Sequence, residues 1–135
     1  MAHWSVDDIA WHRFDPSAAD PEIVKVVKAA AMVEMNGADY ATYLCNVFAD
    51  DAEFCAAARR WAGEEVQHGR ALRRWAELAD PGFDFAAAFQ RFKEGYRLPL
   101  EATASVRGSR AGELVARCVV EVGTSSYYSA LRDAV

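Results

Sequence analysis

Glu65 and His68 are spaced so that their side chains can act together on one helix. Residues three positions apart in an α-helix lie on the same face, one turn from each other. The same face is otherwise apolar at helical spacing, with Phe54, Ala58, Trp61, Ala62, Leu72 and Trp75. A carboxylate and an imidazole on the buried side of a helix need polar partners. A metal ion is one partner that engages both groups.

Glu64 is an alternative partner for His68, because residues four positions apart also share a helix face. The apolar positions around the pair favour Glu65 slightly. Glu64 then lies at the edge of the apolar stripe, where it could pair with an arginine. A single Glu-x-x-His is common by chance, so its meaning depends on what neighbouring helices contribute.

A first helix is expected from Asp20 to about Ala49. Asp20 suits the N-cap and the following Pro21 suits the first turn. Glu34 falls inside the apolar stripe of this helix. Gly37 is an interior glycine, which costs about 1 kcal/mol relative to alanine and indicates close packing.

A second helix is expected from Asp50 to about Ala79, with Asp50-x-x-Glu53 resembling a capping box. The very short connection between the two helices makes them antiparallel neighbours. Residues 80 to 109 then form a long connection that contains a short helix from Phe85 to about Arg97. A connection of this length can return the chain to the other end of a bundle, so that the next helix runs parallel to the second.

A third helix is expected from about Ser109 into Val135. Glu121 lies in its stripe with Leu114, Cys118, Ser125 and Tyr128. Three helices thus each present a glutamate on an apolar stripe: Glu34, Glu65 and Glu121. Facing helices pack about 8–10 Å apart, so these carboxylates can meet at one point. Together with an imidazole they suit iron or manganese, whereas without metal they would repel and their pKa values would rise.

The order of these residues, Glu34, then Glu64-Glu65-x-x-His68, then Glu121 after a long crossover, resembles the ferritin-like superfamily and within it the rubrerythrin-type diiron carboxylate proteins. The segment from Val120 to Tyr128 is similar to the third helix of that group. The resemblance covers residues 20–135 and implies an all-α, antiparallel helix bundle with a long crossover, of which this chain holds three long helices.

The resemblance also implies roles for individual residues. Glu34 would be a terminal ligand of the first metal, Glu65 would bridge the two metals, His68 would bind the first and Glu121 the second. Tyr128 and Tyr40 would donate hydrogen bonds around these ligands. The cofactor implied is a pair of iron ions, with manganese as an alternative, and the implied activity is an oxidoreductase or iron-handling reaction with O2 or peroxide.

Two departures from the family pattern change these expectations. No second Glu-x-x-His on a fourth helix follows within residues 20–135, so that half of the site must come from a longer chain or from another subunit. The uncovered bundle face predicts association, as a homo-oligomer and most simply a dimer. The four-cysteine iron domain of rubrerythrins is also missing, so an external electron donor would be needed. The alternative function is a non-catalytic metal-binding or structural helical bundle that associates as a dimer.

Composition narrows the class of protein further. The length of 135 residues suits one domain, in which residues 1–19 form an N-terminal arm. Hydrophobic residues make up 53% of the chain, which is enough to form a core. The net charge of −5 argues against a broad nucleic-acid surface. No apolar run has the length of a membrane span and no signal core is found, so we expect a cytoplasmic protein. Three cysteines, Cys45, Cys55 and Cys118, fit small core residues better than a disulfide framework.

Overall fold

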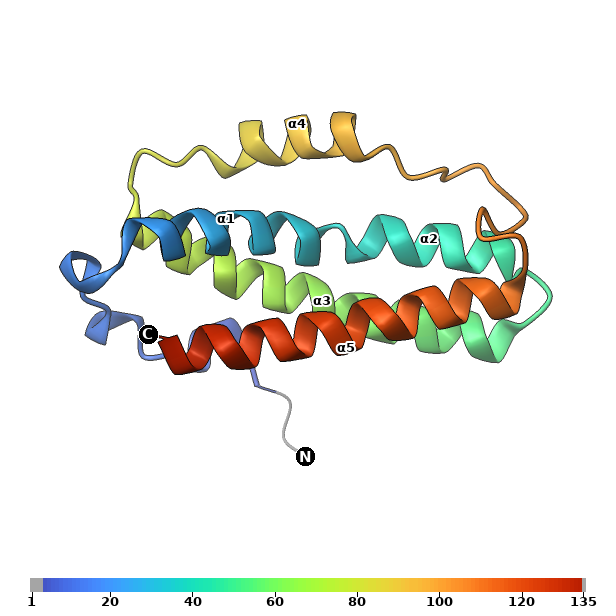
Figure 1. Ribbon diagram of the computed structural model, residues 1–135, viewed down its shortest axis with the longest axis horizontal. Coiled ribbons are helices and arrows are strands. Elements are labelled where there is room, and N and C mark those ends of the chain that lie inside the picture. The colour runs from blue at the N-terminus through green and yellow to red at the C-terminus, as the bar shows by residue number, and fades with distance from the viewer. Residues whose placement is uncertain (1–3, 135) are drawn as a thin grey trace.

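The computed structural model describes residues 4–134, which contain helices and no β-strand (Figure 1). Met1, Ala2 and His3 of the expected arm, and Val135 of the expected third helix, lie outside the described residues. Three one-turn 3-10 helices come first, η1 (Val6–Asp8), η2 (Trp11–Arg13) and η3 (Pro16–Ala18). The α-helices that follow are α1 (Pro21–Met35), α2 (Gly37–Val47), α3 (Ala52–Ala79), α4 (Phe85–Tyr96) and α5 (Arg110–Ala134).

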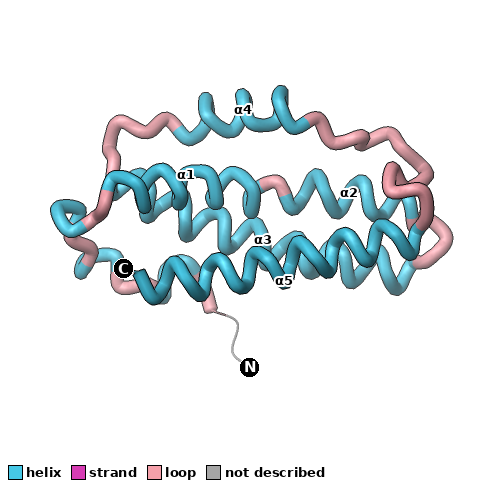
Figure 2. The backbone as a smooth tube through the Cα atoms, in the orientation of Figure 1, coloured by secondary structure: helices cyan, strands magenta, loops and turns pink. Residues whose placement is uncertain are grey.

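The expected single helix from residue 20 to residue 49 is wrong in one respect, because it is broken into α1 and α2 at Asn36 (Figure 2). Asn36 and Gly37 are both poor helix formers, and the Asn36 N–H is shared between the carbonyls of Met32 and Val33. The break changes which residues are buried. Ala38, just after the break, is exposed, whereas Tyr43, Leu44 and Val47 are buried.

The second helix begins one residue later than expected. Asp51, not Asp50, is the N-cap of α3, and its side chain accepts a hydrogen bond from the Phe54 N–H at 2.8 Å. Asp50 instead forms an ion pair with Arg110, which ties the start of α3 to the start of α5. The N-cap expected for α1 is confirmed, since the Asp20 side chain accepts backbone hydrogen bonds there, and Asp84 caps α4 in the same way.

The helices are arranged as the connection lengths predict. α3 runs antiparallel to α1 and α2 and packs along both of them. α4 lies over α1 within the long connection and carries the chain back to the other end (Figure 1). α5 then runs parallel to α3. A compact part of the core is formed by Tyr43, Leu44, Val47 and Phe48 of the α2 region.

The N-terminal arm lies against α3 through aromatic contacts. Phe14 meets Trp75 edge to face, with ring centroids 5.4 Å apart. The Arg74 guanidinium lies over the Trp11 ring at 5.1 Å. These contacts bury apolar surface of the arm against the second half of α3, which anchors the residues that precede α1.

α5 turns a different face to the bundle than its apolar pattern predicts. Leu114, Cys118 and Ser125 of the expected stripe are exposed, so Cys118 is not a core residue. Cys55 is buried and Cys45 partly buried, as expected. The side turned inward carries Glu113, Arg117, Glu121, Thr124 and Tyr128. Glu113 and Arg117 contact side chains of α2 and Tyr128 contacts Glu34 of α1, whereas valines on the opposite side of α5 are exposed.

Helices among residues 4–134 are either too short or too polar to cross a membrane.

Candidate metal centre

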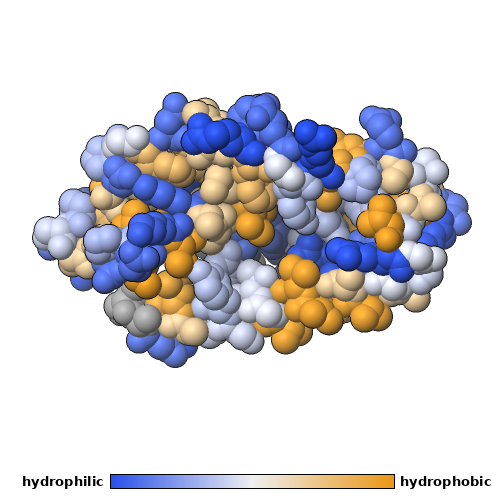
Figure 3. Space-filling view, turned by 45° about the horizontal axis from the view of Figure 1, so that its top comes forward, coloured by the Kyte–Doolittle hydropathy of each residue, from blue (hydrophilic) through white to orange (hydrophobic). Residues whose placement is uncertain are grey.

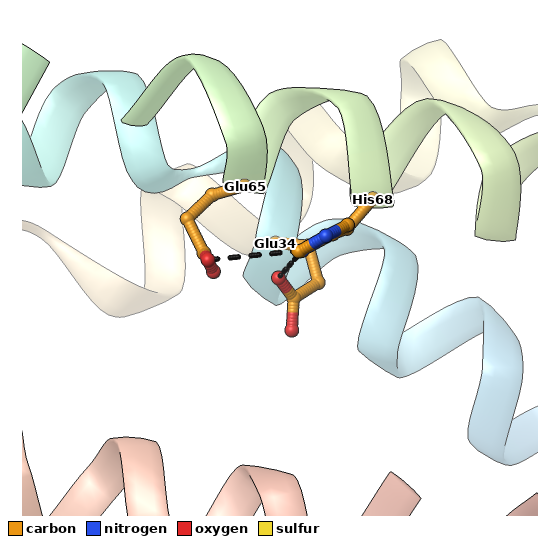
Figure 4. A group of neighbouring side chains, drawn as sticks. All are labelled: Glu34, Glu65 and His68. Atoms are coloured by element: carbon orange, nitrogen blue, oxygen red, sulfur yellow. Dashed lines mark ion pairs between the residues drawn. The ribbon is translucent and has the colours of Figure 1, made fainter. Parts of the chain in front are cut away.

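Glu34, Glu65 and His68 meet between α1 and α3. One donor atom of each lies within 4.8 Å of the donor atoms of the other two. His68 Nδ1 is 3.7 Å from Glu34 Oε2 and 3.7 Å from Glu65 Oε1. Figure 4 shows the three side chains pointing toward one another from α1 and α3, into the space that faces α5. Three of the four expected metal ligands are therefore brought together.

Two glycines let α1, α2 and α3 approach closely at this point. A Cβ on Gly37 would lie 2.7 Å from the Glu65 Cβ, and a Cβ on Gly69 would lie 2.7 Å from the Met35 backbone nitrogen. Real Cβ atoms do not tolerate such distances, so both positions require glycine while the helices keep this separation. The close packing expected of Gly37 is thus confirmed.

The three side chains differ strongly in their electrostatic environment. Glu34 is buried, with only 3% of its surface exposed. Burial alone would raise the pKa of Glu34, but the neighbouring His68, Glu65 and Tyr128 side chains hold it at about 2. Burial and the Glu34 carboxylate raise the pKa of Glu65 to about 8. The Glu34 carboxylate raises the pKa of His68. Without a cation, the Glu65 carboxyl therefore holds a proton at neutral pH.

Of the two adjacent glutamates, Glu65 is the one whose side chain lies beside Glu34 and His68. Glu65 is half-buried, whereas Glu64 is exposed on the outer side of α3. The Glu64 side chain lines a shallow surface depression with Arg60 and Gln67 instead.

Two aromatic residues contact the cluster. The Tyr128 hydroxyl of α5 donates a hydrogen bond to Glu34 Oε1, as its expected role requires. The Trp4 ring stacks on the His68 ring, with centroids 5.8 Å apart and planes inclined by 7°. The Gln67 amide holds the Trp4 carbonyl at 2.6 Å. Trp4 belongs to the expected N-terminal arm, and nothing in its spacing could pair it with His68.

Glu121 lines the same pocket but pairs with Arg117 of its own helix, Oε1 to Nε, at 3.0 Å. Both of these atoms are buried and have no well-aligned hydrogen-bond partner. The Arg117 guanidinium lies over the rings of Tyr40 and Trp61, at 4.9 Å and 5.2 Å from their centroids. Glu121 therefore lies near the cluster, but its carboxylate is paired with the Arg117 guanidinium.

Glu113 is a buried carboxylate that sequence reasoning did not single out. It accepts hydrogen bonds from Tyr40 at 2.8 Å, from Tyr43 at 2.7 Å and from Ser105 at 2.7 Å. Burial opposes its charge, but these donors hold the pKa of Glu113 below its usual value. Tyr40, expected to hydrogen-bond around the metal ligands, thus bonds to Glu113 instead. Burial and, to a smaller extent, this bond raise the pKa of Tyr40 to about 12. The four-residue spacing of Glu113, Arg117 and Glu121 is the signal that could have revealed this polar face.

The cluster opens into a pocket of about 560 Å³. Its walls come from α1, α2, α3 and α5, and the end of α4 reaches its rim. Glu34, Glu65, His68 and Glu121 all line it, together with both expected tyrosines.

A donor set of two carboxylates and one imidazole is one that iron and manganese accept. Glu34 and Glu65 lie so close together that one of the two carboxyl groups holds a proton. A divalent cation that replaced this proton would allow both groups to ionise. The residues present therefore fit a metal ion of this class.

Comparisons with models of protein families, with curated protein sequences and with solved structures gave no match. The functional assignment accordingly rests on the geometry and chemistry of the site.

Proposed function

We propose that this chain is a ferritin-like diiron-carboxylate protein that binds iron at Glu34, Glu65 and His68, with Glu121 as a further ligand. Its reaction is with O2 or peroxide, as an oxidoreductase or in iron handling. The observation that carries the proposal is the convergence of three donor atoms within 4.8 Å on the buried side of two helices.

The helix order supports the ferritin-like assignment. A glutamate on α1, a Glu-x-x-His on the antiparallel α3 and a glutamate on α5 after a long crossover all line one pocket. Bundles of the di-iron carboxylate class place their ligands on facing helices in this manner. The arrangement is specific because residues 34, 65 and 121 are far apart in the sequence.

A bound pair of iron ions supplies the one-electron redox chemistry that reduction of O2 or peroxide requires. The chain's own residues prepare the site for cations. Glu34 is ionised without a metal ion, and Glu65 would release its proton to a bound cation. Tyr128 fixes the orientation of Glu34, and the Trp4 ring restricts the freedom of His68. Such neighbours hold metal ligands in place and tune their basicity.

Glu121 would have to exchange Arg117 for a metal ion to act as a ligand. Arg117 does not depend on this ion pair for its position, because the rings of Tyr40 and Trp61 also hold it. The exchange therefore leaves the guanidinium in the pocket.

The alternative function is a non-catalytic metal-binding or structural bundle. It is favoured by one observation: Glu34 and Glu121 already have partners in Tyr128 and Arg117. These contacts satisfy part of the cluster without a metal ion.

An anaerobic Fe(II) titration with metal analysis separates these functions. We expect the wild type to bind iron and to develop an absorbance band when O2 is added. The variants Glu65→Gln and His68→Ala should lose most of the bound iron, whereas Glu64→Gln, on the neighbouring exposed position, should retain it. Iron bound without any reaction with O2 would support storage. Equal iron content in Glu65→Gln and Glu64→Gln would refute the site. Competition with Mn(II) in the same titration identifies the preferred metal.

The proposal includes a cytoplasmic location, an external electron donor and association as a homo-oligomer, most simply a dimer. Valines exposed along the outer side of α5, Val115, Val119 and Val122, support association, because apolar helix faces of this kind are usually covered. Sedimentation equilibrium of the purified protein measures the oligomeric state directly.

A further inference from the structure

The pocket beside the metal-ligand cluster has the size of a small-molecule site. Its volume of about 560 Å³ lies within the range of about 300–1,000 Å³ that is typical of ligand pockets. Figure 3 shows a hollow near the middle of this face of the molecule, bordered by hydrophilic and hydrophobic side chains. The metal ligands proposed above occupy only part of its wall.

Exposed apolar side chains from three helices converge on this pocket. Val33 of α1, Tyr96 at the end of α4 and Val120 of α5 all line it, and each is about half exposed. Their positions in the sequence are unrelated, so the fold gathers them at one place. An apolar surface gathered at the rim of a cavity is suited to the apolar part of a ligand.

The pocket also has a balance of charge that metal binding would shift. Three guanidinium groups line it, from Arg107, Arg117 and Arg132. Three carboxylates, Glu34, Glu65 and Glu121, oppose them. Any divalent cation held by the carboxylates leaves positive charge in surplus. Although the whole chain has a net charge of −5, the pocket would then carry positive charge and attract anions.

Arg117 is the best-placed group to receive a ligand carboxylate. Its guanidinium is stacked on the rings of Tyr40 and Trp61 and is paired with Glu121 at 3.0 Å. If Glu121 bound a metal ion instead, the rings would still hold Arg117, which would then lack its anion. A carboxylate from outside can then form the charge-assisted hydrogen bonds that Glu121 gave up.

We propose that this pocket binds a small organic carboxylate with an apolar body, its carboxylate at Arg117 and its apolar part against Val33, Tyr96 and Val120. The inference rests on the proposed metal centre, beside which the ligand lies, and names the class of its substrate. A simple inorganic anion would leave the apolar rim uncovered. A neutral apolar molecule would leave Arg117 without a counter-ion.

Calorimetric titration of the metal-loaded protein with octanoate tests the proposal, with octanol as the uncharged control. We expect octanoate to bind at least tenfold more tightly than octanol. Arg117→Gln should remove this preference for the anion.

Two neighbouring valines provide a matched pair of variants. Val120 lines the pocket, whereas Val119 does not and is 68% exposed. Both substitutions by glutamate fall on exposed positions of one helix, so folding should survive, as circular dichroism can confirm. Val120→Glu should weaken octanoate binding at least tenfold and Val119→Glu should leave it unchanged.

Several outcomes overturn the proposal. They are an absence of octanoate binding, equal binding of octanol, or equal loss in the two valine variants. A second copy seated in the pocket would appear in sedimentation as a dimer that octanoate does not bind, and this also overturns it. A protein that binds metal but not octanoate leaves the metal centre standing, whereas a protein that binds no metal refutes both.

Discussion

Tyr128 donates a hydrogen bond to Glu34 across the pocket, joining residues 94 positions apart in the sequence. Glu34 belongs to α1 and Tyr128 to the second half of α5, which otherwise reaches the bundle through few contacts. One hydrogen bond therefore couples the position of α5 to the ionisation of a proposed metal ligand. Its removal has a defined consequence for stability.

Tyr128→Phe should destabilise the metal-free protein by about 1.5–3 kcal/mol, the usual value of a hydrogen bond to a charged group. Urea unfolding at pH 7 measures this loss. Tyr127→Phe is the matched control, because Tyr127 is exposed on the same helix and should change stability by less than about 0.5 kcal/mol. Equal stability of the two variants would show that the contact with Glu34 contributes nothing.

Glu65→Gln should make the metal-free protein more stable in mild alkali. The pKa of Glu65 is about 8 in the folded chain, above the value near 4.5 of an unperturbed glutamate. An acid with a raised folded pKa loses stability as pH rises from its unfolded pKa toward its folded pKa. Glutamine mimics the protonated acid and avoids that loss.

We therefore expect Glu65→Gln to match the wild type near pH 4.5 and to exceed it by about 1–3 kcal/mol at pH 8. Urea unfolding across this range provides the measurement, with Glu64→Gln as control. A difference between Glu65→Gln and the wild type that does not grow with pH would contradict the raised pKa. The same substitution removes most of the bound iron in the proposal above, so stability and metal affinity should move in opposite directions.

Glu113→Ala should cost about 3 kcal/mol or more, since it leaves the hydroxyls of Tyr40, Tyr43 and Ser105 without their buried acceptor. The exposed Glu101→Ala is the control and should stay within about 0.5 kcal/mol of the wild type. Thermal unfolding compares the two.

The pH dependence of this cluster has the opposite sign to that of Glu65. The pKa of Glu113 is lowered on folding, so its contribution is present above the unfolded pKa near 4.5 and is lost as pH falls through the folded value. The gap in stability between wild type and Glu113→Ala should therefore shrink in acid. A gap that is constant down to pH 3 would show that the charge of Glu113 does not matter.

Gly69→Ala should destabilise the protein by about 1–3 kcal/mol, because the added Cβ meets the Met35 backbone. Gly63→Ala, on the same helix, meets nothing within 4 Å and should raise stability by up to about 1 kcal/mol through helix propensity. Chemical unfolding of both variants tests the close approach of α1 and α3. Stabilisation by both substitutions would mean that the helices lie farther apart.

The pattern of residues was enough to predict the helices and three of the proposed ligands. The spacing of the apolar residues and the capping residues predicted the helices. The lengths of the connections predicted that α3 runs antiparallel to the first helix and that α5 follows a crossover. The spacing of the apolar residues also placed Glu34, Glu65 and His68 inward. These features follow from local rules, since spacing along one helix decides which side chains share a face.

The sequence alone could not place residues that depend on contacts between helices. Arg117 reaches the rings of Tyr40 and Trp61, and Glu113 reaches hydroxyls on α2 and on the crossover. The apolar pattern predicted that Cys118 and Leu114 lie on the inner face of α5. Both are exposed, because α5 turns its polar side, with the buried Glu113, toward the bundle. The break at Asn36 likewise went unpredicted, because the apolar stripe continues across it.

The sequence by itself determined which candidate ligands share a helix face, because three- and four-residue spacing fixes the face of a helix. Tertiary structure decided which of them meet. It brought Glu34 to within 3.7 Å of His68, paired Glu121 with Arg117 and placed Tyr128 on Glu34. The physical reason is that helix separation, set here by Gly37 and Gly69, and the rotation of α5, set by its buried charges, depend on partners distant in the chain.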